Sequence, residues 1–134
     1  KRSGFDDCVL LDPQGFVSEG SGENIFTIRK GILYTPPITT ALDGITRDSI
    51  ITIANDQGYK VIEQMISRDQ LYIADEVFVV GTAAECVPVR EIDFRQIGSG
   101  KAGPVTRNIQ QQYQAAVHGN QPRYEHWLDY VNQA

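Results

Sequence analysis

Apolar and polar positions alternate along the first third of the chain in the way that is typical of β-strands. A hairpin is predicted over residues 7–19, because Pro13 presets the backbone at the second turn position and Gly15 can take the last. A second hairpin is predicted over residues 24–34, where Gly31 can adopt the positive φ of a tight turn. This part of the chain is therefore expected to form antiparallel strands.

The apolar pattern changes to a helical period in the middle of the chain. Residues 35–40 include two prolines and predict a stiff, extended connector. Residues 45–57 then place their apolar side chains on one helical stripe, and Gly58 is suited to follow the end of that helix. Residues 60–65 alternate again, which predicts a strand.

A short helix and a buried strand are predicted next. Residues 67–73 favour a helix because Ser67 and Gln70 have the spacing of a capping box. Residues 76–80 form an apolar run that indicates a strand buried on both faces, and this run ends at the small residues 81–84. The order of helices and strands predicts crossover connections as well as hairpins.

The last third of the chain combines a hairpin with helices. Runs at residues 87–91 and 94–97 favour the hairpin, and Pro104 opens a helix that ends near His118. The inward stripe of this helix is predicted to be Val105, Ile109, Gln112 or Tyr113, and Ala116. Residues 125–131 predict a short amphipathic helix. The whole pattern predicts an α/β (α+β) fold with a mixed sheet and packed helices.

Composition indicates one globular domain over residues 1–134, since 41% of the residues are apolar and 22% are charged. The net charge of −5 argues against nucleic acid or an anionic membrane surface as the main partner. Cys8 and Cys86 are far apart and lack metal-site spacing, so we expect free thiols, no metal centre and a reducing compartment such as the cytoplasm.

Two acidic residues stand among small residues just before a predicted strand, in the segment Ser-Glu-Gly-Ser-Gly-Glu-Asn-Ile-Phe at residues 18–26. Glu19 and Glu23 could line a site to which a ligand comes close. The same residues are also typical of an ordinary solvated turn. The segment alone leaves both interpretations open.

Two further junctions could bind an anion. In residues 42–47, Gly44 and Thr46 open a helix, so that backbone N–H groups and the positive end of the helix dipole face outward. In residues 81–84, small residues end a buried strand, and their backbone N–H groups could bind an oxyanion or a carboxylate. Ligands often bind at the carboxyl ends of strands in sheets that have helical crossovers. The simpler alternatives are that Thr46 is only a helix cap and that residues 81–84 are a tightly packed strand exit.

Common catalytic motifs are absent from the sequence. His118 lies at a helix end and His126 in the tail, and neither context suggests a catalytic base. No Gly-x-Ser-x-Gly elbow, phosphate-binding Walker loop or His-Glu-x-x-His occurs. Common hydrolase and nucleotide-binding functions are therefore not predicted.

The chain resembles branched-chain-amino-acid aminotransferases, which belong to the pyridoxal-phosphate enzymes of fold type IV. The resemblance covers nearly the whole chain and rests on Glu19-Gly-Ser-Gly-Glu-Asn-Ile-Phe26, Tyr34-Thr-Pro-Pro37, Gly44-Ile-Thr-Arg-Asp48, Ala74-Asp-Glu-Val-Phe78, Gly81-Thr-Ala-Ala-Glu85, Gly103-Pro-Val-Thr106 and Trp127-Leu-Asp129. It implies a partly barrel-like sheet, pyridoxal 5'-phosphate as cofactor, amino acids and 2-oxo acids as substrates, and at least a homodimer.

The resemblance also implies roles for residues at the cofactor. Glu19 matches the acidic residue at the pyridine nitrogen, where a carboxylate keeps the ring protonated. Ile45 and Thr46 match the helix start that holds the cofactor phosphate, and Thr82 matches a further phosphate or substrate contact. Leu42 matches an apolar residue packed against the cofactor ring. The remaining match is Ala83, whose N–H would meet the substrate carboxylate.

The Lys that forms the Schiff base in this family has no match in the chain, because it lies further upstream of the Glu19 position than the residues present here. Lys1, Lys30, Lys60 and Lys101 do not match its position. We therefore expect residues 1–134 to be the C-terminal, cofactor-binding domain of such an enzyme, without its N-terminal domain and without activity alone.

Three other functions remain open from the sequence. D-amino-acid aminotransferases and aminodeoxychorismate lyases share the fold type, and a non-catalytic domain could keep the anion sites without the chemistry. The segments Gly-Glu-Asn-Ile-Phe and Gly-Thr-Ala-Ala-Glu favour the branched-chain enzymes, which transfer the amino group of Leu, Ile or Val to 2-oxoglutarate.

Overall fold

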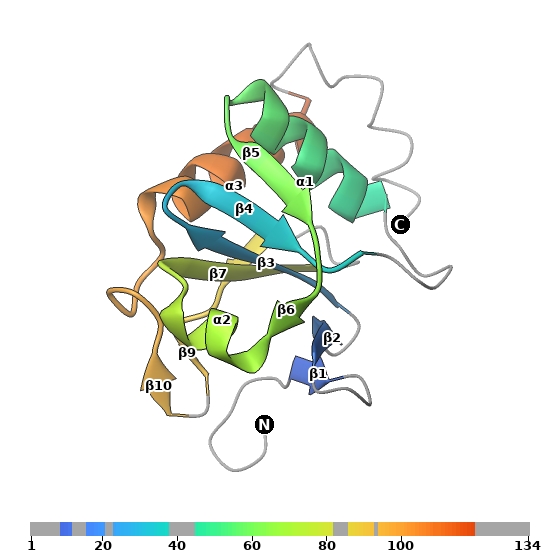
Figure 1. Cartoon of the computed structure of the whole chain (residues 1–134). Coiled ribbons are helices and arrows are strands. Elements are labelled where there is room, and N and C mark those ends of the chain that lie inside the picture. The colour runs from blue at the N-terminus through green and yellow to red at the C-terminus, as the bar shows by residue number, and fades with distance from the viewer. Residues whose placement is uncertain are drawn as a thin grey trace.

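The computed structural model describes residues 9–11, 16–20, 23–37, 45–81, 86–92 and 94–119. Its helices are α1 (Ile45–Asp56), α2 (Arg68–Ile73) and α3 (Pro104–Val117). Its strands are β1 (Val9–Leu11), β2 (Phe16–Gly20), β3 (Glu23–Arg29), β4 (Ile32–Thr35), β5 (Lys60–Glu63), β6 (Ile66–Ser67), β7 (Glu76–Gly81), β8 (Cys86–Pro88), β9 (Glu91–Ile92) and β10 (Arg95–Gln96). The predicted mixture of sheet and helices is confirmed (Figure 1).

Strand β3 lies at the centre of the sheet. It pairs antiparallel with β4 on one edge and with β7 on the other, and the β7 ladder extends from Glu23 opposite Gly81 to Ile28 opposite Glu76. Strand β5 adds to β4 in parallel, and β8 adds to β7. Strand β2 joins the start of β3 and pairs also with β1 and β6. The sheet is therefore mixed, as the sequence predicts.

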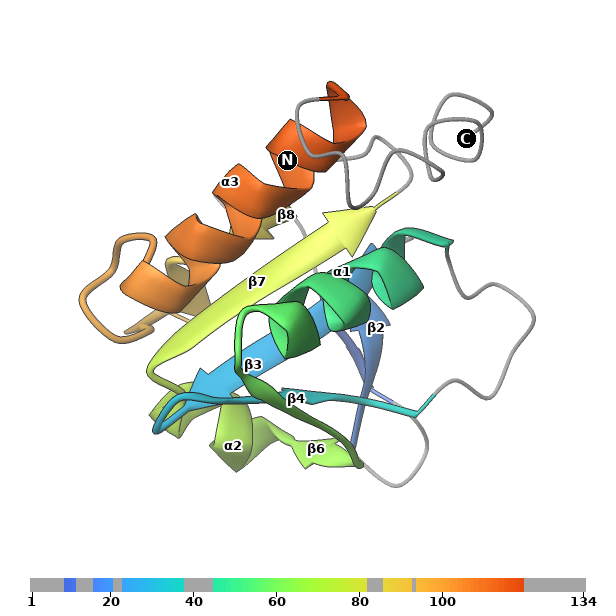
Figure 2. The same ribbon diagram turned by 90° about the horizontal axis from the view of Figure 1, so that it is seen from above.

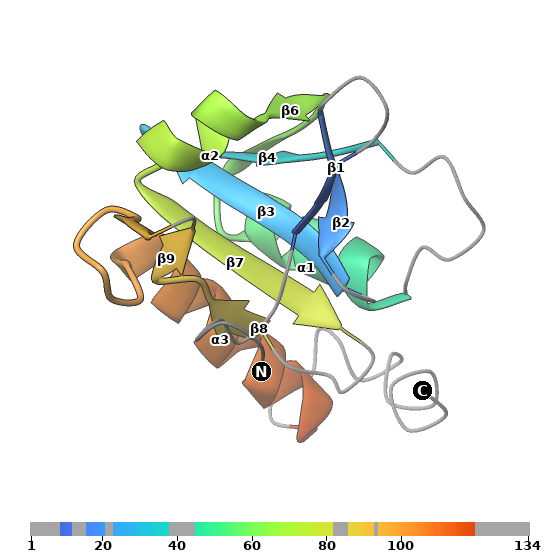
Figure 3. The same ribbon diagram turned by 90° about the horizontal axis from the view of Figure 1, so that it is seen from below.

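The two faces of the sheet bury two separate apolar clusters. Helices α1 and α3 cover one face, and α2 and β6 lie on the other side (Figures 2 and 3). Phe26 and Phe78 stack beneath α1 and α3, with ring centroids 5.0 Å apart. Ile25 and Val77 point to the opposite cluster with Leu71 of α2. Alternation along β3 and β7 thus builds both cores, as expected for strands buried on both faces.

Several local predictions are confirmed. Strands β1 and β2 form the first hairpin, and the second turns through Lys30 and Gly31, whose φ angles are 52° and 78°. The capping box has formed, because Ser67 accepts the N–H of Gln70 and the Gln70 side chain accepts the N–H of Ser67. On α3 the inward stripe contains Tyr113 rather than Gln112.

Two predictions are wrong in part. The strand predicted over residues 60–65 ends at Glu63, and Ile66–Ser67 pairs instead with β2. Of the hairpin predicted over residues 87–97, only the pairing of β9 with β10 has formed. The strand Cys86–Pro88 pairs with β7 instead. Without β8, backbone groups on the outer edge of β7 would have no partner. Pairing with β8 gives them one.

Other predictions fall outside the described residues. These are residues 38–40 of the connector predicted at residues 35–40, the turn at residues 12–15 and the helix at residues 125–131. Within the part of the chain that the structure describes, no helix is long and apolar enough to cross a membrane. The same part contains no group of three or more His, Cys, Asp and Glu side chains that could hold a metal ion.

A buried carboxylate of β7 holds the start of α3. The Oε1 atom of Glu76 accepts the N–H of Thr106 at 2.8 Å, and its Oε2 atom accepts the N–H of Val105 at 3.3 Å. The Glu76 side chain also lies where a Cβ atom at Gly103 would sit, 2.2 Å from the Glu76 Cδ atom, so this position requires Gly. A negative charge at the positive end of the helix dipole stabilises the packing of α3 on the sheet.

We expect Glu76→Gln to lower the free energy of unfolding by about 1–3 kcal/mol, because the amide loses the charge and one of the two acceptor atoms. Urea denaturation followed by circular dichroism measures this change. Glu91→Gln is the matched control, since Glu91 is exposed on β9. Equal stability of the two variants would contradict a stabilising role for the Glu76 carboxylate.

Candidate functional site

The candidate site lies at the end of the sheet where β2 ends, β3 begins and β7 ends. Gly20 is opposite Glu23, and Glu23 is opposite Gly81, so these three residues form one row across the adjacent strands. Glu19 is the residue of β2 directly before this row and pairs with Leu10 of β1. The register therefore brings the backbone of the acidic segment next to the strand exit before residues 82–84.

The start of α1 lies at the same end of the sheet. Figures 2 and 3 both show the first turn of this helix near the ends of β2 and β7. Ile45 and Thr46 are the first two residues of α1, and Thr46 is half-buried. The first N–H groups of a helix have no partner within the helix, and with the helix dipole they favour an anion.

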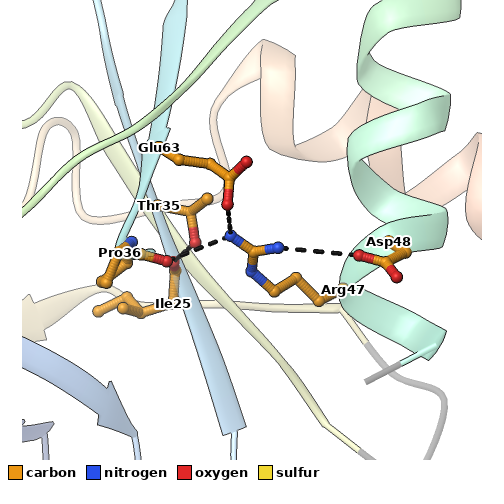
Figure 4. Close-up of polar contacts among 6 residues, drawn as sticks. All are labelled: Ile25, Thr35, Pro36, Arg47, Asp48 and Glu63. Atoms are coloured by element: carbon orange, nitrogen blue, oxygen red, sulfur yellow. Dashed lines mark hydrogen bonds and ion pairs between the residues drawn. The ribbon is translucent and has the colours of Figure 1, made fainter. Parts of the chain in front are cut away.

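Arg47 fixes this first turn to the sheet. Its side chain is 5% exposed, and one Nη atom lies 2.6 Å from Oε1 of Glu63 at the end of β5. The same nitrogen donates to the carbonyl oxygen of Pro36 at 3.2 Å, and the other lies 3.7 Å from the exposed carboxylate of Asp48 (Figure 4). The guanidinium thus joins α1 to two points of the β4 and β5 edge.

The last residue of β4, Thr35, is hydrogen-bonded to β3. The buried hydroxyl of Thr35 donates to the carbonyl oxygen of Ile25 at 2.8 Å (Figure 4). Thr35 pairs with Glu63, the residue that holds Arg47. A continuous set of polar contacts therefore runs from β3 to the first turn of α1, which sets the position of the helix start against the strand ends.

The structure brings together some of the predicted site residues. Glu19 and the pair Ile45 and Thr46 lie on elements that meet at this end of the sheet. Leu42 lies outside the described residues. So do Thr82 and Ala83, which follow directly after the end of β7. For Glu19 and Ile45 the backbone alone is described.

The lysines that the structure describes lie at the other end of the sheet. Lys30 is in the turn after the end of β3, and Lys60 is opposite Ile32 at the start of β4. Lys101 is in the loop before Gly103, which contacts the start of β7 at Glu76. Each is exposed. Each of the three lysines therefore lies away from the candidate site.

Cys86 is not a nucleophile at this site. It is a free, buried thiol, as predicted, and burial raises its pKa to about 12. The thiol therefore stays protonated at neutral pH, and a thiol is far less reactive than a thiolate.

Arg47, next to the site, has a role that sequence reasoning missed. Arg47 is a charged residue, and charged side chains are usually exposed. Its burial depends on partners in other segments of the chain, Pro36 and Glu63, which no local sequence pattern shows.

The chain belongs to the class IV aminotransferases. The model of the family described as "Amino-transferase class IV" matches residues 1–92. These residues include Glu19, the start of α1 and the end of β7, which are the elements that build the candidate site. The resemblance seen in the sequence is therefore confirmed at the level of the family.

Curated relatives are named branched-chain-amino-acid aminotransferases. One from Pseudomonas aeruginosa is 51% identical over 128 residues, which cover 96% of this chain and 42% of the relative. One from Escherichia coli is 50% identical over 134 residues and covers 99% of this chain and 43% of the relative. The chain thus spans about two fifths of the length of the relatives that it matches.

Solved structures share the fold. The branched-chain aminotransferase of the archaeon Thermoproteus uzoniensis with norvaline has a TM-score of 0.86 and 46% identity, covering 92% of this chain and 41% of that one. The enzyme from Thermobaculum terrenum in its PLP form has a TM-score of 0.88 and 41% identity, over 92% of this chain and 41% of that one. The mixed sheet with packed helices is therefore that of an aminotransferase of this family.

We expect Arg47→Met to lower the free energy of unfolding by about 1–3 kcal/mol, because the buried carbonyl oxygen of Pro36 loses its donor and Glu63 its partner. Arg47→Lys should recover part of this loss, since one ammonium group keeps the charge without the planar geometry of the guanidinium. Denaturant unfolding measures both changes. Arg107→Met, at an exposed position of α3, is the control and should change stability little. An equal loss in the control would argue against the role of Arg47.

Proposed function

We propose that this chain is the cofactor-binding domain of a branched-chain-amino-acid aminotransferase. The complete protein would transfer the amino group of Leu, Ile or Val to 2-oxoglutarate. The observation that carries the proposal is the meeting of Glu19 on β2, the first turn of α1 and the end of β7 at one end of the sheet. Relatives about half identical to the chain and named for this activity support it.

The site residues fit pyridoxal 5'-phosphate. The start of α1 offers N–H groups and the Thr46 hydroxyl to a phosphate. Tyr113 of α3, which packs in one cluster with Ile50 of α1, has a buried hydroxyl without a hydrogen-bond partner among the described residues. A carboxylate on β2 suits the opposite, nitrogen-bearing end of the ring. A further solved branched-chain amino acid aminotransferase, with a TM-score of 0.89 and 53% identity, contains pyridoxamine 5'-phosphate, which supports the same cofactor here.

When bound, pyridoxal phosphate supplies a ring that accepts the electron pair left at the α-carbon of the substrate. The Glu19 carboxylate would hold a proton at the pyridine nitrogen and so strengthen this electron acceptor. Ile45 and Thr46 would hold the phosphate through the start of α1. Leu42 would pack against the ring and fix its plane.

The strand exit at the end of β7 would orient the substrate. Thr82 would contact the phosphate or the substrate, and the N–H of Ala83 would bind the substrate carboxylate. Backbone N–H groups at the end of a strand suit this task because they are fixed in direction and carry no charge that must be neutralised.

We further propose that residues 1–134 form the second domain of the enzyme and that a preceding segment supplies the Schiff-base Lys. The exposed positions of Lys30, Lys60 and Lys101, at the opposite end of the sheet, support this arrangement. In the complete protein the sheet would be partly barrel-like, and the protein would act in the cytoplasm as a homodimer or larger homo-oligomer. The buried, unpaired Cys86 is consistent with a reducing compartment.

The complete protein with pyridoxal phosphate should convert Leu, Ile and Val to their 2-oxo acids with 2-oxoglutarate as acceptor. Glutamate formation in a coupled assay measures this reaction. D-alanine and aminodeoxychorismate serve as alternative substrates, and we expect far lower kcat/KM for both. A preference for either would assign the protein to another enzyme of the same fold type, and turnover of none would favour a binding domain.

The 134-residue chain alone should not form a covalent adduct with the cofactor, because the described lysines lie away from the site. Incubation with pyridoxal phosphate, borohydride reduction and peptide mass spectrometry test this. Low, scattered labelling of exposed lysines is expected. Stoichiometric labelling of one Lys would contradict the proposed upstream position of the Schiff-base residue.

A further inference from the structure

The side chain of Arg47 joins the first turn of α1 to the strands beside it. It is 5% exposed and extends from α1 toward Pro36 and Glu63 (Figure 4). Its Nη2 atom lies 2.6 Å from Oε1 of Glu63, the last residue of β5, and donates at 3.2 Å to the carbonyl oxygen of Pro36, the residue that follows β4. A single nitrogen atom therefore holds two strand ends.

The same two strand ends are fixed to β3, at the centre of the sheet. Thr35 is opposite Glu63 in the parallel pair of β4 and β5. Its buried hydroxyl donates to the carbonyl oxygen of Ile25 at 2.8 Å. Ile25 is two residues after Glu23, which lies in the row of strand ends at the candidate site. The contacts of Arg47 thus connect the start of α1 with the strands that carry the rest of the site.

The charge of Arg47 is already balanced within this group of contacts. Glu63 lies 2.6 Å and Asp48 lies 3.7 Å from the guanidinium. One cation and two carboxylates together have no positive charge left for a third anion, since carboxylates are ionised at neutral pH. Arg47 is therefore placed to influence a phosphate through the position of the backbone rather than by direct attraction.

We propose that Arg47 is a positioning residue for the phosphate end of the cofactor site. Ile45 and Thr46 directly precede it in α1, so the contacts that fix Arg47 also fix the direction of their N–H groups. A hydrogen bond weakens steeply when its donor turns away from the acceptor, so a loosened first turn binds a phosphate less tightly. This inference rests on the proposed function, and it adds a residue that does not itself touch the cofactor.

The test uses the apo form of the complete protein and two ligands that differ only in the phosphate, pyridoxal 5'-phosphate and pyridoxal. Arg47→Met removes the guanidinium and keeps an apolar side chain. We expect the Kd for pyridoxal phosphate to rise about 3- to 10-fold, while the Kd for pyridoxal stays the same. Titration followed by protein fluorescence measures both constants. Loss of folded protein would weaken the binding of both ligands, so the ratio of the two Kd values isolates the phosphate.

A substitution of Glu63 separates position from charge. Glu63→Met removes a negative charge, which by charge alone would strengthen the binding of a phosphate. It also removes the partner that holds Arg47, so positioning predicts the opposite, a Kd for pyridoxal phosphate that is about 2- to 5-fold higher. The double variant Arg47→Met/Glu63→Met should bind no more weakly than Arg47→Met alone, because both substitutions break the same contact.

Two further variants complete the comparison. Arg47→Lys should recover part of the affinity, because an ammonium group can meet one of the two partners but lacks the planar guanidinium. Arg107→Met is the matched control, since it removes the same side chain from an exposed position of α3. It should leave both Kd values unchanged.

The outcomes are distinguishable. A selective loss of pyridoxal phosphate affinity in Arg47→Met and in Glu63→Met supports the inference, and Glu63→Met with Arg47→Lys decides it if Arg47→Met does not fold. Unchanged affinity, an equal loss for both ligands, or tighter binding of pyridoxal phosphate by Glu63→Met overturns it while the proposed function stands. Failure of the unaltered protein to bind pyridoxal phosphate overturns the proposed function, and this inference with it.

Discussion

The ladder between β3 and β7 is the constraint on which the rest of the structure depends. Its six residue pairs, from Glu23 opposite Gly81 to Ile28 opposite Glu76, place two strands that are largely buried on both faces side by side. Alternate side chains then build the core under α1 and α3 and the core on the side of α2. The two ends of the ladder contact different parts of the fold. One end holds α3 through Glu76, and the other joins β2 and the strand exit into the candidate site.

Polar contacts within the fold fix the helices against this ladder. Apolar packing alone is non-directional and leaves a helix some freedom to slide or rotate. Arg47 removes that freedom at the start of α1, since its guanidinium must meet both Glu63 and the carbonyl oxygen of Pro36. A site that binds a phosphate through backbone N–H groups requires such fixed positions, because the N–H directions follow the helix as a rigid body. The buried contacts of Arg47 thus also fix the backbone of its neighbour, Thr46.

The sequence predicted the elements with local signals and missed contacts between distant segments. Gly31, the Ser67 and Gln70 pair, and Pro104 each determine a turn or a helix end within a few residues, and each prediction is confirmed. The pairing of β8 with β7 and of β6 with β2 depends on which sheet edges remain open, which no local pattern shows. Glu19 and Thr46 were singled out by local patterns and given roles through a resemblance, whereas their meeting follows from register and topology. Arg47 could not be predicted as buried, because its partners come from two other parts of the chain.

The two longer helices differ in what surrounds their positive ends. At α3 the chain's own Glu76 accepts the first N–H groups, so the charge of the helix dipole is already balanced by a buried carboxylate. At α1 the neighbouring groups are the Arg47 guanidinium, which the Pro36 carbonyl oxygen and Glu63 already hold, and the half-buried side chain of Thr46. Glu63 balances the charge of Arg47 from the side of β5 and leaves the Thr46 hydroxyl as a neutral donor. An external anion such as a phosphate would therefore find its complement at α1, while at α3 the protein supplies the anion itself.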